Sequence, residues 1–257
     1  MELKVLGASG GLVAGGATTS FLLDSHILLD GGTGIGSLSL EQMCAIDSLL
    51  LTHAHLDHIA GAALMLASTI DYRTTPLTIY APESVLTTLK QHLFNWQIWP
   101  DFAVLPSEVA PVLHYQSIRE GELFQLAGLQ IEAVALSHTV PSFAYLVADG
   151  ARSFCFCGDT AATQTLWQRI NERGGVDQLF IELSYPQHKA DIAKLAGHYD
   201  TASLAQDIQL LERPLRLNLM HAKPGYEELL QQAVARNPAL GTLSVHHCHQ
   251  GESLDVL

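Results

Sequence analysis

The feature that most constrains the fold of this chain is a histidine-rich turn between an apolar strand and a helix. Residues 47–51 end in three leucines and are expected to form a buried strand, which runs directly into His53-Ala54-His55-Leu56-Asp57-His58. Residues 58–70 are rich in Ala, Leu and Met and are expected to be helical. Such a turn can direct neighbouring side chains into one cleft. Because imidazole and carboxylate groups are common metal ligands, this run predicts a metal site.

Three further ligand-type residues stand at the ends of expected strands. His138, Asp159 and His221 each come shortly after a run of apolar residues. Taken alone, each would more often be an ordinary loop residue than a ligand. Strand ends at one edge of a sheet are, however, where an α/β scaffold gathers a site. Their shared placement therefore indicates that they join the histidine-rich turn.

The rest of the chain alternates expected strands and helices. Further strands are expected at 3–6, 18–23, 26–29, 77–80, 122–124, 129–135, 142–147, 152–157, 179–182, 215–220 and 243–245. Further helices are expected at 82–94, 161–173, 201–211, capped by Thr201, and 226–235. Residues 95–118, which contain three prolines, are expected to be irregular. We find no repeat and no linker, so we expect one domain over residues 1–257, with helices outside two packed sheets.

The charge of the chain limits its partners. It has 26 acidic and 13 basic residues among 257, a net charge of −13, and no Lys/Arg cluster. That disfavours nucleic acid, which is bound through many phosphate contacts. A small anionic substrate remains compatible, because bound dications can supply a local positive field.

Neither the hydrophobic pattern nor the cysteines suggest export or a membrane. No apolar run reaches the roughly 18 residues of a membrane helix, and the N-terminal residues do not resemble a signal peptide. Cys44, Cys155, Cys157 and Cys248 show no paired spacing, so a reduced, cytoplasmic setting is expected. Cys155 and Cys157 alternate along an expected strand and are interpreted as pointing to opposite faces.

Two other histidine segments need an interpretation. His246-His247-Cys248-His249 lies at a strand end and is interpreted as an ordinary loop rather than a third metal site. His198 lies just before the helix that begins near Thr201. Contact with a substrate and a plain helix-capping role are both open for it.

The ligand-type residues resemble the set found in the metallo-β-lactamase superfamily. This resemblance implies an α/β (α+β) protein with the metallo-β-lactamase fold, an αββα four-layer sandwich. By the same resemblance, Asp30 would support the ligand loop. One metal would be held by His53, His55 and His138, the other by Asp57, His58 and His221, with Asp159 as the bridge.

Within that superfamily, the chain resembles the class II 3′,5′-cyclic-nucleotide phosphodiesterases. The matching stretches are 6–11, 30–36, 51–61, Ile181-Glu182-Leu183-Ser184-Tyr185-Pro186, Gly197-His198 and His221-Ala222-Lys223-Pro224. The resemblance implies hydrolysis of cAMP or cGMP with two divalent metal ions, zinc (Zn²⁺) first and Mn²⁺ or Fe as alternatives.

Three residues would then be catalytic. Asp57 would orient the attacking hydroxide, His198 would protonate or contact the departing oxygen, and Glu182 would polarise His198. Ser184 or Tyr185 could line the nucleotide pocket.

Three alternatives are kept beside this function. A tRNA 3′-processing ribonuclease would use the same metals, but it should carry a basic or Gly/Pro-rich arm for tRNA. A thioesterase or lactonase would need different substrate residues after Asp159. A metal-binding module without activity is disfavoured, because structural zinc sites usually close with four ligands. The sequence leaves open the choice between cAMP and cGMP and the oligomeric state, with a homodimer as one alternative.

Overall fold

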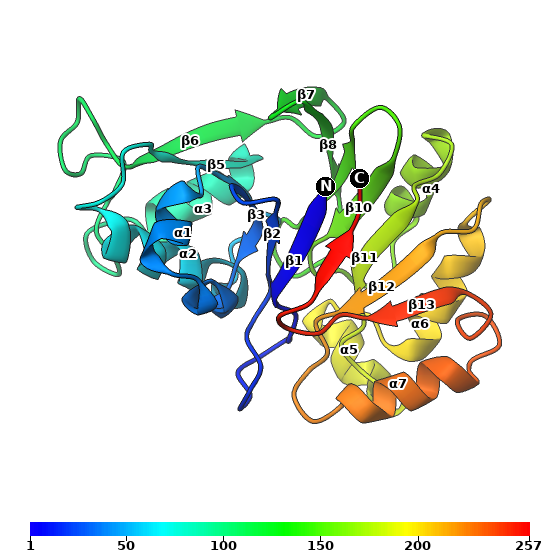
Figure 1. The fold of residues 1–257 in the computed structure, drawn as a ribbon. Coiled ribbons are helices and arrows are strands. Elements are labelled where there is room, and N and C mark those ends of the chain that lie inside the picture. The colour runs from blue at the N-terminus through cyan, green and yellow to red at the C-terminus, as the bar shows by residue number, and fades with distance from the viewer.

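The computed structural model describes residues 1–257, and two seven-stranded sheets form its centre (Figure 1). The first sheet has the strand order β14 (Ser253–Asp255), β1 (Glu2–Gly7), β2 (Ser20–Leu23), β3 (Ile27–Gly31), β4 (Ser48–Leu50), β5 (Leu77–Pro82) and β6 (Leu113–Ile118). Helices α1 (Leu40–Ala45), α2 (Leu56–Thr69) and α3 (Glu83–His92) cover its outer face, and the short 3-10 turn η1 (Thr33–Ser37) follows β3.

The second sheet has the strand order β13 (Ser244–His247), β12 (Arg216–Met220), β11 (Gln178–Glu182), β10 (Ser153–Cys157), β9 (Phe143–Ala148), β8 (Leu129–Ala135) and β7 (Leu123–Leu126). Its outer side carries α4 (Gln164–Glu172), α5 (Ala190–Ala196), α6 (Thr201–Asp207) and α7 (Glu227–Arg236), with 3-10 turns η2 (Gln187–Lys189) and η3 (Ile208–Leu210). The layers run helix, sheet, sheet, helix, as the sequence predicted.

Aromatic side chains fill the space between the sheets. The ring of Phe21 on β2 meets Phe156 on β10 edge to face at 5.1 Å between centroids, and Phe180 on β11 at 6.0 Å. These residues belong to a cluster of 44 buried residues, and a second cluster of 22 lies largely between the second sheet and its helices. Burial of this apolar area is the main force that holds the layers together.

The direction of the strands gathers the ligand-type residues at one edge. β10, β11 and β12 are parallel, and β8 runs the same way because both β8 and β10 are antiparallel to β9. The carboxyl ends of these strands meet at the edge where β3 and β4 of the first sheet also end. His138, Asp159 and His221 follow three of these ends, as the sequence analysis expected.

Several elements differ from the sequence expectation. Residues 113–118, expected to be irregular, form the edge strand β6, in which only Leu113 and Ile118 are buried. An edge strand with solvated polar residues lacks the apolar run by which buried strands are recognised. The short elements α1, α5 and β14 were also missed, and α2 begins at Leu56 rather than at residue 58.

Two local expectations are wrong. The cap of α6 is Asp200, not Thr201, since the Asp200 carboxylate accepts hydrogen bonds from the backbone N–H groups of Ala202 and Ser203. Cys155 and Cys157 lie on the same face of β10, with their sulfur atoms 3.7 Å apart. Residues two apart on a strand share a face, so alternation should have placed them together.

No helix of this structure is long and apolar enough to cross a membrane. The single domain expected over residues 1–257 stays a prediction.

Candidate metal centre

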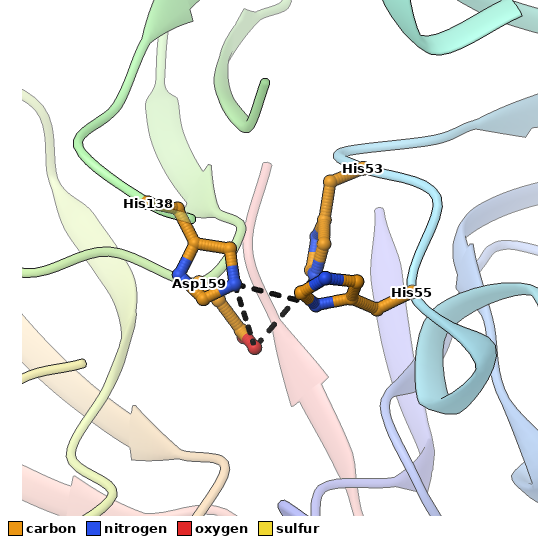
Figure 2. A group of neighbouring side chains, drawn as sticks. All are labelled: His53, His55, His138 and Asp159. Atoms are coloured by element: carbon orange, nitrogen blue, oxygen red, sulfur yellow. Dashed lines mark hydrogen bonds and ion pairs between the residues drawn. The ribbon is translucent and has the colours of Figure 1, made fainter. Parts of the chain in front are cut away.

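Seven histidine and aspartate side chains converge at the shared edge of the two sheets. One group consists of His53, His55, His138 and Asp159, which Figure 2 shows close together; the other consists of Asp57, His58, Asp159 and His221. Each residue offers one ligand atom, and within each group these atoms lie within 4.8 Å of one another. The structure therefore brings together the two sets that the resemblance implied.

The junction between β4 and α2 places four of these side chains. His53 lies in the turn, His55 is the N-cap residue of α2, and Asp57 and His58 occupy its first turn. The helix packs very closely on the chain after β3, because a Cβ atom at Gly61 would overlap the carbonyl oxygen of Gly32. Glycine at this position lets α2 hold its first turn against the sheet edge.

Asp159 lies between the two groups. Its Oδ1 atom is 3.3 Å from His58 Nε2, and its Oδ2 atom is 3.3 Å from His221 Nε2. On the other side, Oδ2 is 3.7 Å from His53 Nε2 and 4.0 Å from His138 Nε2. One carboxylate thus faces ring nitrogens of both groups, as a bridging ligand would.

Asp30 at the end of β3 orients His58. Its carboxylate accepts hydrogen bonds from the Thr52 backbone N–H and from the Thr52 hydroxyl, each at 2.8 Å, and from His58 Nδ1 at 2.6 Å. Because His58 donates through Nδ1, Nε2 is the nitrogen that faces the centre and would bind a metal. Asp30 has φ 55°, in the left-handed region. These contacts are the ones that the supporting role predicted for Asp30 requires.

Other histidines are oriented in the same manner. His138 Nδ1 donates to the carbonyl oxygen of Gly197 at 2.7 Å. The Thr52 hydroxyl, which donates to Asp30, accepts from His53 Nδ1 at 3.0 Å. His221 Nδ1 lies 3.1 Å from Ser184 Oγ, whose proton goes to Glu182. In each ring the remaining nitrogen, Nε2, is the one that faces the centre.

These contacts leave ring nitrogens and carboxylate oxygens crowded together at the centre. His53 Nε2 is buried and has no hydrogen-bond partner. His58 Nε2 and His221 Nε2 are 3.3 Å apart, and both face Asp159. Although burial opposes it, Asp159 and Asp30 raise the pKa of His58 well above its ordinary value, so without a metal a proton on His58 supplies the positive charge that this crowded centre requires. A bound dication would take the place of that proton. The donor set therefore fits divalent metal ions, which imidazole and carboxylate ligands suit.

Burial and charge act in opposite senses on the ionisation of these groups. Burial lowers the pKa of the three imidazoles of the first group, which keeps these rings neutral and able to bind a cation: His53, His55 and His138. Burial also opposes a charge on Asp159, but the nearby His221 and His58 hold the pKa of that carboxyl well below its usual range. Asp159 is thus ionised, as a metal ligand must be.

His198 and Glu182 form a buried pair beside the centre. His198 Nδ1 lies 2.8 Å from Glu182 Oε1 and 3.8 Å from Asp159 Oδ2. Burial raises the pKa of Glu182 to about 8 and lowers the pKa of His198 to about 4, so both shifts favour the uncharged forms. His198 Nε2 has no partner within the protein. The ring is therefore held by one nitrogen and leaves the other for a bound molecule.

The part that Ser184 plays was not predicted from the sequence. We expected Ser184 or Tyr185 to line a nucleotide pocket, but Ser184 is fully buried and bridges Glu182 and His221. Tyr185 is half-buried, and its ring centroid lies 6.0 Å from that of His198. Both residues stand in one short motif after β11, and only the three-dimensional path of the chain separates their roles.

Comparison with known proteins places this arrangement in a family. The family described as "Beta-lactamase superfamily domain" matches residues 26–222. The chain belongs to this superfamily, and its architecture is the metallo-β-lactamase fold.

Two relatives and one solved structure resemble this chain over most or all of its length. The chain is 29% identical to the "Probable 3′,5′-cyclic-nucleotide phosphodiesterase" of Yersinia pestis, over 88% of this chain and 79% of that protein. It is 26% identical to the "Ribonuclease BN" of Proteus mirabilis, over 68% of this chain and 59% of that protein. The solved structure of unliganded yeast PDE1 superposes with a TM-score of 0.83 at 19% identity, covering 100% of this chain and 99% of that one.

Proposed function

We propose that this protein is a metal-dependent phosphodiesterase that hydrolyses 3′,5′-cyclic nucleotides, such as cAMP or cGMP, to 5′-nucleotides. The observation that carries this proposal is Asp159, which faces two ligand-type groups and lies beside the His198–Glu182 pair. The name of the Yersinia pestis relative, which aligns over most of both chains, supports the substrate class.

The donor set supports two divalent ions, with zinc as the first expectation and manganese or iron as alternatives. One ion would be held by His53, His55 and His138, the other by Asp57, His58 and His221, and both by Asp159. When bound, such ions supply an activated water near neutral pH and positive charge for the phosphoryl oxygens. Asp57, whose side chain is 28% exposed, can also accept a hydrogen bond from that water.

His198 is the candidate general acid. With both groups uncharged, the Glu182 carboxyl group can donate a hydrogen bond to Nδ1, so the proton of the imidazole stands on Nε2, where the departing 3′ oxygen needs one. Glu182 itself is fully buried and accepts a hydrogen bond from the Thr160 backbone N–H at 2.7 Å. It is therefore a positioning residue that acts through His198.

Aromatic side chains extend from His198 to the surface. Tyr185 lies 6.0 Å from His198 and 6.0 Å from Tyr226, and His188 follows at 6.4 Å from Tyr226, all between ring centroids. Aromatic faces of this kind stack on nucleobases without reading their sequence. They support a nucleotide, rather than a simple phosphodiester, as the substrate.

The competing functions differ in their substrates. A tRNA 3′-processing ribonuclease is favoured by the ribonuclease relative but opposed by the net charge of −13. A thioesterase or lactonase would use the same donor set and would not need the row of aromatic side chains beside His198.

The four free cysteines support the expected reduced, cytoplasmic setting.

The test is a substrate panel assayed with metal-loaded protein. We expect cAMP or cGMP to be hydrolysed to the 5′-nucleotide faster than precursor tRNA, a thioester or a lactone is cleaved, and Asp159→Ala to abolish the activity. Faster cleavage of precursor tRNA, or tight tRNA binding with a steep salt dependence, would assign the site to the ribonuclease function. Failure to hydrolyse bis-(p-nitrophenyl) phosphate as well would reject an enzymatic role.

A further inference from the structure

A separate group of ligand-type side chains lies between the last two strands. His246 near the end of β13, Cys248 and Glu252 each offer one donor atom, and these atoms lie within 4.8 Å of one another. His246 Nε2 is 2.8 Å from Glu252 Oε1. We propose that His246, Cys248 and Glu252 form an additional metal site, which binds Zn²⁺ and ties the two sheets together.

The chemistry of this group suits zinc. A thiolate, an imidazole and a carboxylate are all zinc ligands, and the thiolate favours zinc over the hard cations magnesium and calcium. Three protein ligands leave a fourth position for water or for the imidazole of His249, whose ring centroid is 6.3 Å from that of His246. The catalytic centre contains no cysteine, so the two kinds of site differ in donor chemistry.

The position of the group explains what a metal would do there. The Cys248 backbone N–H donates to Leu219 of β12 at 2.8 Å, which attaches this residue to the second sheet. The Glu252 carbonyl oxygen accepts from Val5 of β1 at 2.9 Å, which attaches that residue to the first sheet. A cation held by Cys248 and Glu252 would join the sheets at the segment where the chain crosses between them.

An unpaired buried oxygen lies on the same side of the sheet. Asn218 on β12 is fully buried and is the direct partner of His246 on β13, so the two side chains share a face. Its Nδ2 atom donates to Gln178 Oε1 at 3.2 Å, but its Oδ1 atom has no partner. A buried oxygen without a donor is costly. A metal ion held by His246 would lie on the face of the sheet where this oxygen needs a positive partner.

Cobalt substitution tests the site directly. Metal-free protein is titrated with Co²⁺ while its absorption spectrum is recorded. Because only this site has a sulfur ligand, a near-ultraviolet thiolate-to-cobalt charge-transfer band reports it alone. We expect the band in the wild-type protein, with about one more metal per chain than the two of the catalytic centre.

Matched variants assign the band. Cys248→Ser should abolish it and lower the metal content by about one ion per chain, and His246→Ala should weaken it, whereas Cys44→Ser should leave it unchanged. His53→Ala should also keep the band, since this residue belongs only to the catalytic centre. Zinc should raise the melting temperature of the wild type more than that of Cys248→Ser.

The wild-type spectrum decides the question even where a variant does not fold. Absence of the band at saturating cobalt, or its persistence in Cys248→Ser, would overturn the proposal. Neither outcome touches the proposed phosphodiesterase activity, which is measured with the substrate panel and depends on different residues.

Discussion

At the scale of single residues, four histidines of the metal centre use one ring nitrogen for a supporting contact and direct the other nitrogen toward the centre. His53, His58, His138 and His221 all make a contact through Nδ1 and turn Nε2 inward. His198 also makes its contact through Nδ1, with Glu182, but the same nitrogen lies 3.8 Å from Asp159 Oδ2, and Nε2 has no partner within the protein. This difference separates a ring suited to proton transfer from rings suited to metal binding.

His198→Ala tests this distinction. We expect turnover of the cyclic nucleotide to fall by about 10²–10⁴-fold, the usual contribution of general acid–base catalysis. The loss should shrink for bis-(p-nitrophenyl) phosphate, because p-nitrophenolate leaves without a proton. Metal content and melting temperature, measured in parallel, should stay near wild type. An equal loss on both substrates would leave His198 with phosphate contact only.

Asp159→Ala tests the bridging position. The carboxylate faces ring nitrogens of both ligand groups, so its removal should abolish turnover and lower the number of bound metal ions per chain. Elemental analysis of purified, reloaded protein measures this, and circular dichroism checks that the fold survives. Retained wild-type turnover would contradict the assignment.

At the scale of elements, Asp30 links the end of β3 to the turn after β4 and to α2. Asp30→Ala would leave three buried partners unpaired, the Thr52 N–H, the Thr52 hydroxyl and His58 Nδ1. We expect the free energy of unfolding of the metal-free protein to fall by about 1–3 kcal/mol. Metal affinity should fall by about 10–100-fold, because an oriented ligand is lost.

Urea unfolding and metal titration measure these two effects. The exposed Asp71 at the end of α2 serves as the control, and Asp71→Ala should change neither quantity. If Asp30→Ala matched this control, Asp30 would have no supporting role.

The long elements and the ligand positions could be predicted from the sequence. β8, β10 and β12 are apolar runs that end close to His138, Asp159 and His221, and parallel strands bring such ends together. A single polar residue after a buried strand can be recognised from the local sequence. The prediction that it lies at the sheet edge holds because the same apolar pattern sets the register and direction of the strand.

Elements stabilised by contacts far along the chain could not be predicted in this way. β6 exposes most of its side chains and exists because β5 pairs with it. β14 has three residues and depends on pairing with β1, at the other end of the chain. Likewise, the bridge that Ser184 makes between Glu182 and His221 needs β11 and β12 side by side.

At the scale of the whole molecule, one apolar cluster contains side chains of both sheets, among them Phe21 and Phe156. The two halves of the chain therefore share their core. We expect residues 1–257 to unfold as one domain, with a single calorimetric transition whose van't Hoff and calorimetric enthalpies agree in metal-free protein. Two separable transitions would show two domains.

The backbone of His221 links the chemistry of the centre to the stability of the whole chain. This residue has φ 63°, a left-handed conformation that is sterically unfavourable for any residue with a Cβ atom. His221→Gly and His221→Ala both remove the imidazole, but only glycine adopts this conformation freely. Metal-free His221→Gly should therefore be more stable than His221→Ala, by about 1 kcal/mol in chemical unfolding.

Equal stability of the two variants would show that the surrounding hydrogen bonds, not the steric effect of Cβ, dominate at this position. A clear difference has a consequence for heat resistance. Selection for a more thermostable protein would favour glycine here, whereas selection for the reaction retains histidine. Position 221 would then mark a point where adaptation to temperature and retention of activity demand different amino acids.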